Sequence, residues 1–327
     1  MDHNSVAAFR ARAITALSRA TLAPNDSIQV APIRKAGILC GMIPLRDMLP
    51  SRRFPIVTVS LIVLNLLVFL FQGFLGTQPP YRENWADERA EWVAARLEEP
   101  PIFSSYYAYA TGQRILSSMP STYEIGRNEW FQTQYALIPA ELLSGRDLPP
   151  TIPILLWLTV LTSMFLHGGI LHLLGNMLYL WIFGDNVEDA MGPVRFLAFY
   201  LLCGIVAAFV QIAIGPGSSI PMVGASGAIA GILAAYFMLF PQSRVLTLVP
   251  LFFFLRLVAI PAVFLLGFWF LWQVISGAGS FGNSGGVAFF AHIGGFIAGL
   301  FLVFPFRRRH VPVTLWRMIQ NRRTPHR

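Results

Sequence analysis

One serine stands between two glycines near the start of an apolar stretch, PMVGASGAIAG at 221–231. Ser226 is either a small packing residue or a nucleophile. A serine hydroxyl attacks a carbonyl only when an adjacent base, most often a histidine, takes its proton. His292 is the candidate base, because it lies in a second apolar stretch, FFAHIGGFIAG at 289–299.

Two further polar side chains, His172 and Asn176, lie on a third apolar stretch. Their i, i+4 spacing places them on one face of a helix. Attack on an amide carbonyl creates an oxyanion, which hydrogen-bond donors stabilise best in a site that excludes water. We therefore expect His172 and Asn176 to stabilise an oxyanion, together with the backbone N–H groups of Ser226 and Ala225 at a helix start.

The acidic residues nearest to His172 along the chain are Asp185, Glu188 and Asp189. They follow His172 by ~20 Å along the same helix, which places them near its far end. We therefore predict a Ser–His dyad without a buried carboxylate. The orientation of the histidine, which a third residue provides in a catalytic triad, must then be absent or provided by packing.

Three histidines, His167, His172 and His292, form an alternative set of ligands for a metal ion. The i, i+5 spacing of the first two argues against that reading, as does the lack of cysteine or carboxylate at the same depth. We expect neither a metal nor another cofactor.

The composition indicates a membrane protein, with 55% hydrophobic and only 12% charged residues. Apolar runs of ~20 residues without charge are typical of transmembrane helices. Six spans are predicted, at 56–75, 170–187, 194–214, 221–240, 257–276 and 286–306. Residues 152–166 are apolar but short, and we expect them to be interfacial or re-entrant. Residues 245–255 are also short and apolar, and either segment would change the count if it crossed.

Basic residues gather at the two ends of the chain, which carries a net charge of +8. Next to spans this pattern reports topology rather than a nucleic-acid partner. We predict a cytoplasmic segment over 1–53, a membrane domain over 54–306 and a cytoplasmic tail over 307–327. The segment 77–150 then forms an extended loop on the outer side, with an amphipathic helix at 84–99.

This topology brings the polar groups to one level, because the second, fourth and sixth spans all enter from the outer side. His172, Asn176, Ser226 and His292 then lie roughly 4–10 Å below the outer face. Small-residue faces allow two membrane helices to approach closely. If the face of the fourth span meets that of the sixth, Ser226 and His292 can form a hydrogen bond. The residues of these faces are Gly227 and Gly231 in the fourth span and Gly295 and Gly299 in the sixth.

In combination these motifs resemble the rhomboid intramembrane serine proteases of bacteria. The resemblance rests on HGGILHLLGN (167–176), GDNVEDAMG (184–192), GASGAIAG (224–231) and AHIGGFIAG (291–299), with IPLRDMLPSRRFP (43–55) and YALIPAEL (135–142) in addition. It implies an all-α, polytopic membrane protein with a six-helix bundle and a re-entrant or interfacial first outer loop. It also implies residence in the bacterial inner membrane.

The resemblance implies an endopeptidase that cleaves transmembrane protein substrates near the outer face, through an acyl-enzyme. Ser226 matches the family's nucleophile and His292 its base, while His172 and Asn176 match its oxyanion-stabilising residues. His167, Gly224 and Ala225 are expected to support the site. The loop at 276–286 would cap it.

The chain departs from the family pattern in that no Trp-Arg pair occurs in 77–166, and 77–134 is longer than expected. Residues 1–41 are typical of a targeting peptide or a cytoplasmic leader, and Met42 is an alternative start. Two other functions remain open: an inactive rhomboid-like protein that binds membrane clients, and a transporter or channel that uses the histidines.

Overall fold

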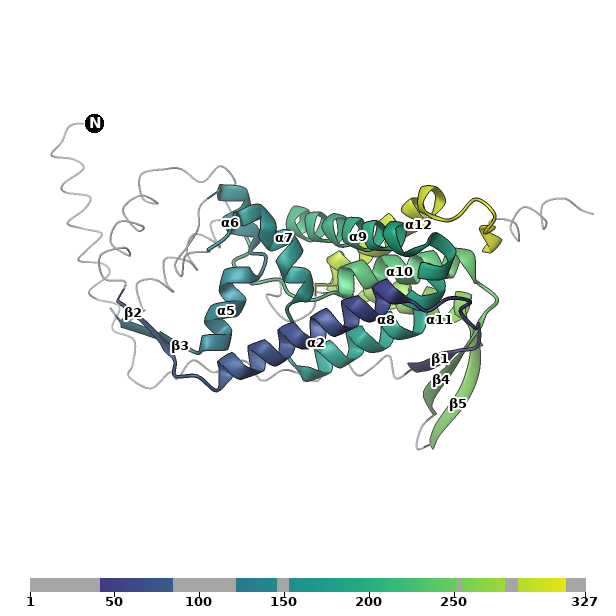
Figure 1. The fold of residues 1–327 in the computed structure, drawn as a ribbon, viewed down its shortest axis with the longest axis horizontal. Helices are drawn as coiled ribbons and strands as arrows, with labels where there is room; N and C mark the ends of the chain where they lie inside the picture. The colour runs from purple at the N-terminus through teal and green to yellow at the C-terminus, as the bar shows by residue number, and fades with distance from the viewer. Residues whose placement is uncertain (1–41, 85–121, 146–152, 252–253, 280–287, 316–327) are drawn as a thin grey trace, which may run out of the picture. The chain divides into compact units, whose positions relative to one another are not determined.

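The computed structural model is mostly helical (Figure 1). It describes residues 42–84, 122–145, 153–251, 254–279 and 288–315 of the 327. The predicted amphipathic helix at 84–99 lies almost wholly outside this part of the chain. Of the predicted loop at 276–286, only the first residues are described, and they belong to the end of a helix.

Within the described residues, four helices are long and apolar enough to cross a membrane. They are α2 (Ile56–Gly76), α9 (Pro193–Ile214), α11 (Ala262–Gly279) and α12 (Phe289–Phe306). A fifth span is possible where Leu156–Phe165 and α8 (Ile170–Met191) join at a bend of 81°. The chain is therefore a helical, polytopic membrane protein, as the sequence predicts.

The bent segment corresponds to the short apolar stretch 152–166. It contains two 3-10 turns, η1 (Leu156–Leu158) and η2 (Ser163–Phe165), on either side of α7 (Thr159–Thr162). A sharp turn before α8 fits the expectation of a re-entrant or interfacial lead-in better than a straight crossing.

Two details of the predicted spans differ in the structure. The fourth helix, α10 (Ser226–Leu239), has only 14 residues and begins at the serine itself. The predicted span 257–276 is wrong at its start, because Phe254–Pro261 forms strand β5 and the helix begins at Ala262. Six helices thus follow the six predicted segments, but only some of them meet the length of a full crossing.

The ambiguous segment 245–255 is not a crossing. It contributes to β4 (Arg244–Leu251) and β5, which pair antiparallel, with Val245 opposite Ile260. β4 also pairs with β1 (Ile43–Asp47), so the sheet order is β1-β4-β5. The sheet lies at one end of the helices (Figure 1). A short apolar run bounded by turns suits a strand as well as a helix, and here pairing with β1 favours the strand.

The long segment between α2 and α8 contributes several further elements. β2 (Tyr81–Asn84) and β3 (Thr122–Ile125) form a two-stranded antiparallel sheet. Two short helices follow, α5 (Arg127–Tyr135) and α6 (Pro139–Ser144).

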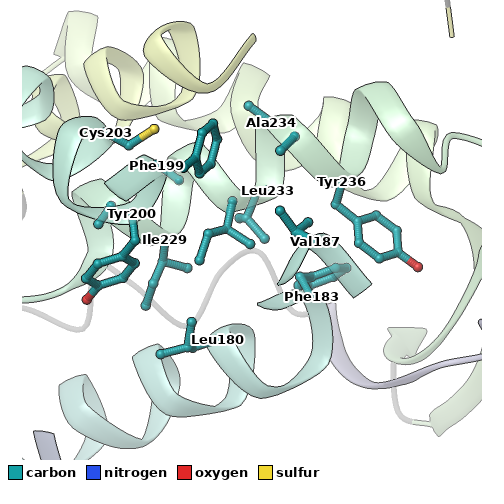
Figure 2. Close-up of a cluster of buried hydrophobic side chains, with 14 of the residues drawn as sticks. Leu180, Phe183, Val187, Phe199, Tyr200, Cys203, Ile229, Leu233, Ala234 and Tyr236 are labelled. Carbon is teal, nitrogen blue, oxygen red and sulfur yellow. The ribbon is translucent and has the colours of Figure 1, made fainter. Parts of the chain in front are cut away.

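Helix α10 is enclosed by the other helices, and all of its residues except Ser226 and Phe237 are buried. Apolar side chains from α8, α9 and α10 form the core around it (Figure 2). The labelled core residues are Leu180, Phe183, Val187, Phe199, Tyr200, Cys203, Ile229, Leu233, Ala234 and Tyr236. A helix that is apolar on every face is stable when other helices surround it. This arrangement explains the position of the short helix α10 at the centre of the bundle.

The contact between α10 and α12 is made backbone to backbone. A Cβ atom at Gly295 would overlap the carbonyl oxygen of Gly227, and one at Gly299 would lie 2.7 Å from Cα of Gly231. A Cβ atom at Gly231 would lie 2.5 Å from Cβ of Cys203 in α9 and 3.2 Å from the carbonyl oxygen of Gly295 in α12. Small residues therefore set the distance between these three helices.

The end of α8 nearest the sheet holds neighbouring elements through polar contacts. The Glu188 carboxylate accepts hydrogen bonds from the backbone N–H groups of Val57 (3.0 Å) and Thr58 (2.8 Å). These N–H groups belong to the first turn of α2, where no intrahelical acceptor exists and a negative charge is favourable. Glu188 thus fixes the start of α2 against α8.

Asp47 joins the sheet to the bundle. Its Oδ2 atom accepts hydrogen bonds from Nδ2 of Asn186 in α8 (2.7 Å) and from the hydroxyl of Tyr236 in α10 (2.8 Å). Burial raises the pKa of Asp47 to about 6, although the Tyr236 hydrogen bond opposes the shift. One carboxyl group therefore holds β1, α8 and α10 together.

The glycine contact predicts that Gly299→Ala destabilises the protein. The added methyl would meet the backbone of Gly231, which cannot move without separating α10 from α12. Overpacking of this kind costs about 1–3 kcal/mol, so the midpoint of thermal unfolding in detergent should fall. Gly73→Ala in α2 is the matched control, because nothing lies within 4 Å of a Cβ atom there. Equal midpoints for the two variants would contradict the role given to this contact.

The Asp47 carboxyl predicts a pH dependence of stability. Its pKa in the folded chain, about 6, is above the ordinary value of 3.8, so the folded form binds the proton more tightly. The stability due to this proton is complete below the ordinary value and is lost as the pH rises through about 6. Thermal unfolding between pH 4 and pH 7 should show this loss in the native protein, and Asp47→Asn should reduce it. An identical pH profile for the variant would refute the assignment.

Candidate active site

Ser226 is the first residue of α10, and the loop before it is held in place by main-chain contacts. Met222 forms a β-bridge with Leu137, and the N–H of Gly224 donates to the carbonyl oxygen of Ser163 at 2.8 Å. Gly224 has a φ angle of +123°, a backbone conformation that residues other than glycine rarely adopt. The half-buried Ser226 side chain thus lies where the first-turn N–H groups of α10 lack intrahelical acceptors.

His292 lies in the first turn of α12, next to the start of α10. Its Nε2 atom is 2.7 Å from Oγ of Ser226, a hydrogen-bond distance. The glycine contact between α10 and α12 is what brings the two side chains together. A hydroxyl and an imidazole at this distance form the arrangement that nucleophilic catalysis requires.

A third side chain, which the sequence analysis did not single out, contacts the far side of the imidazole. Oε1 of Gln273 in α11 lies 2.8 Å from Nδ1 of His292. Gln273 is buried, with 7% of its surface exposed. The signal was present in the sequence, because an amide in an otherwise apolar span requires a partner. The contact of Gln273 with His292, however, depends on how α11 packs against α12, which the sequence does not indicate.

His172 and Asn176 of α8 lie beside the loop that leads to Ser226. A Cβ atom at Gly224 would be 2.8 Å from Nε2 of His172 and 3.8 Å from Nδ2 of Asn176. Asn176 is buried, and its Nδ2 atom has no hydrogen-bond partner among the described residues. Glycine at position 224 therefore leaves room for both donors close to the serine.

His167 is buried beside His172, with 5.2 Å between the ring centroids. Its backbone is held by Gln72 of α2, whose Oε1 accepts from the His167 N–H at 3.2 Å and whose Nε2 donates to the His167 carbonyl at 3.3 Å. Neither ring nitrogen of His167 has a hydrogen-bond partner within the described part of the chain. His167 thus packs behind His172 rather than next to Ser226.

The acidic residues that the sequence places far from the site are engaged elsewhere. Glu188 fixes the start of α2, and Asp189 accepts a hydrogen bond from the backbone N–H of Arg52 at 3.3 Å. In the described ranges, no group of three or more His, Cys, Asp or Glu side chains is arranged to hold a metal ion. The partner of the His292 Nδ1 atom is an amide, not a carboxylate.

Comparison with known proteins identifies the fold family. Residues 156–309 match the family described as Rhomboid domain. Over 149 residues the chain is 36% identical to "Rhomboid protease GluP" of Bacillus subtilis (strain 168). The aligned segment covers 44% of this chain and 25% of the relative. Over 173 residues it is 30% identical to "Presenilin-associated rhomboid-like protein, mitochondrial" of Homo sapiens, covering 50% of this chain and 42% of the relative.

The matched part of the chain spans less than half the length of each of these relatives. The match includes the bent segment, α8 to α12 and thus every side chain at the Ser226–His292 contact. Residues 156–309, which hold the Ser226–His292 contact, are therefore a rhomboid domain.

Proposed function

We propose that this protein is an intramembrane serine endopeptidase that hydrolyses peptide bonds of transmembrane proteins. Membership of the rhomboid family by itself supports either intramembrane proteolysis or another rhomboid-like function. The observation that carries the proposal is the 2.7 Å contact between Ser226 Oγ and His292 Nε2. A client-binding protein has no need of a histidine in hydrogen-bond contact with a serine at a helix start.

In the first half-reaction, Ser226 Oγ attacks the carbonyl carbon of the scissile bond while His292 Nε2 takes the hydroxyl proton. The C–N bond of the tetrahedral intermediate then breaks. Nε2 gives the same proton to the departing amine, and an ester between Ser226 and the substrate remains. A water molecule reverses the sequence, because Nε2 takes its proton as it attacks the ester. Ser226 recovers its hydroxyl proton when the carboxylic acid product leaves.

The oxyanion of each tetrahedral intermediate needs donors on the side of Ser226 away from His292. His172 and Asn176 are proposed for this role, supported by their position beside Gly224. The Asn176 amide supports it further, since the described residues offer its Nδ2 no acceptor. The first-turn N–H groups of α10 would add to the same pocket. Gly224 and Ala225 then serve by shaping the loop, and His167 by packing behind His172.

The predicted membrane topology is part of the proposal. We place the basic segment 1–53 and the tail 307–327 in the cytoplasm and the segment 77–150 on the opposite side, in a bacterial inner membrane. The pairing of β1 with β4 supports this, because β1 belongs to the basic segment and β4 follows the end of α10 farthest from Ser226. The site would then open toward the outer face, where transmembrane substrates could reach it.

The proposal predicts that an activity-based fluorophosphonate probe labels the purified protein at Ser226. Ser226→Ala should abolish labelling, and His292→Ala should nearly abolish it because the hydroxyl loses its base. Cleavage of transmembrane substrates in liposomes should fall by about 10⁴-fold or more in both variants. Ser219→Ala, a change of an exposed serine outside the site, is the matched control and should leave both readouts unchanged.

A folded wild-type protein that the probe does not label, and that binds membrane clients without cleaving them, would favour the inactive rhomboid-like function. Solute flux in liposomes that persists in Ser226→Ala would favour a transporter. Either result would overturn the assignment of Ser226 as a nucleophile.

A further inference from the structure

Gln273 is a buried polar side chain in the otherwise mostly apolar helix α11. The helix reads AVFLLGFWFLWQVISGAG, and Gln273 is its one amide. A buried amide costs free energy unless its polar atoms find partners. Here Oε1 faces Nδ1 of His292 at 2.8 Å, while the opposite ring nitrogen faces Ser226 at 2.7 Å. The imidazole is thus held from both sides, by side chains on two different helices.

The chemistry of a neutral imidazole makes this contact directional. One ring nitrogen carries a proton and donates, and the other accepts. A carbonyl oxygen can only accept, so an amide oriented with Oε1 toward the ring requires the proton on Nδ1. Nε2 is then unprotonated and able to take the Ser226 proton. In the other tautomer Nε2 carries the proton and cannot act as a base.

We propose that Gln273 is the positioning residue for His292, whose side-chain carbonyl holds the imidazole in the Nδ1–H tautomer and directs Nε2 toward Ser226. This inference rests on the proposed Ser–His chemistry and supplies the orienting group that a dyad lacks. Unlike the carboxylate of a triad, the amide brings no charge with it.

The surroundings of the contact explain why an amide suits this position. Trp269 of α11 lies 5.9 Å from the His292 ring between centroids, and Phe296 of α12 lies 6.2 Å from Trp269. A carboxylate at this buried position would be costly, because it would lose its hydration next to a neutral imidazole. A neutral acceptor orients the ring without that cost.

The experiment compares Gln273→Leu, Gln273→Glu and the control Val274→Ala, which shortens an exposed side chain next to Gln273 in the same helix. The readouts are kcat and KM on a transmembrane substrate and the rate of fluorophosphonate labelling against pH. Gln273→Leu should lower kcat by about 10- to 100-fold with little change in KM, because the productive tautomer is no longer enforced. Val274→Ala should behave as the wild type.

Gln273→Glu restores an acceptor and adds a charge that stabilises the imidazolium. It should retain more activity than Gln273→Leu, and the acid limb of its pH–rate profile should move to higher pH. A purely structural role predicts equal losses in both variants and an unmoved profile, which would overturn the inference. If Gln273→Leu does not fold, the profile of Gln273→Glu decides alone. Wild-type protein that labels at Ser226 while Gln273→Leu labels equally fast refutes this inference and leaves the proposed function standing.

A different observation carries a second inference, at the end of α12 far from His292. A cavity of about 510 Å³ lies between the end of α12 and the start of α9. Cationic and aromatic side chains line it, namely Arg195, Arg307, Arg308, Arg309, His310 and Phe304. Its lining contains no Asp or Glu, so an anion would meet several positive charges and no repulsion.

The backbone is shaped to admit one of these arginines. Gly192 has a φ angle of +86°, and a Cβ atom there would lie 2.9 Å from Nη2 of Arg308. The absence of a side chain at Gly192 therefore leaves room for the Arg308 guanidinium. Arg195 lies in the first turn of α9, where the helix dipole also favours an anion. Phe304, with 43% of its surface exposed, extends the site along the apolar surface of α12. An anionic group attached to an apolar chain would satisfy both parts.

We infer that this cavity binds the phosphate group of an anionic phospholipid, with the acyl chains against α12. Native mass spectrometry of the detergent-purified protein with phosphatidylglycerol tests this directly. Arg195→Gln combined with Arg308→Gln should lower the apparent affinity for phosphatidylglycerol by about 10-fold or more. Arg256→Gln, which removes an exposed charge from β5, is the matched control and should retain the wild-type affinity.

Two further arms identify the ligand. Phosphatidylcholine retained as tightly as phosphatidylglycerol, or a loss of affinity in Arg256→Gln equal to that in the double variant, would overturn the inference. Inorganic phosphate that competes for the site at millimolar concentration without lipid would assign it to free phosphate instead. Circular dichroism and size-exclusion profiles establish that the double variant is folded.

Discussion

The direct contact of two backbones, α10 against α12, is the constraint on which the rest of the site depends. Gly295 and Gly299 lie against the backbone of Gly227 and Gly231 with no room for a Cβ atom, so α12 approaches α10 at backbone contact. Ser226 directly precedes Gly227, whose backbone contacts Gly295 of α12. This contact leaves the Ser226 hydroxyl little freedom to move away from α12. The serine–histidine distance is thus a property of helix packing, not of a flexible loop.

The candidate site is distributed over four helices, and each contributes a different side chain or pair of side chains. α10 presents the hydroxyl of Ser226, α12 the imidazole of His292, α8 the side chains of His172 and Asn176, and α11 the amide of Gln273. Hydrogen bonds in apolar surroundings are electrostatically stronger than the same bonds in water. The same surroundings make every unpaired polar atom costly. A displacement of any one helix would therefore affect the chemistry and the stability together.

The sequence predicted the part of this site that local spacing determines. The common depth and the glycine pairs on two spans led to the expectation that Ser226 lies beside His292. The i, i+4 spacing of His172 and Asn176 placed those two side chains on one face of a helix. Gln273 was missed because its contact depends on how α11 rotates against α12, and no local pattern encodes that rotation. The sheet was missed for a related reason. Residues 245–255 are apolar except for Thr247, so periodicity cannot separate a strand from a helix, and pairing with β5 and with the distant β1 decides.

The wholly buried thiol of Cys203 lies where α9 meets α10, directly against Gly231. Because it fills the space that a side chain at Gly231 would occupy, a reagent can reach it only when these helices separate. Alkylation of Cys203 would therefore report each separation of α9 from α10. The rate at which a small, membrane-permeant alkylating agent modifies this sulfur would measure how often the helices around the serine part, without any introduced label.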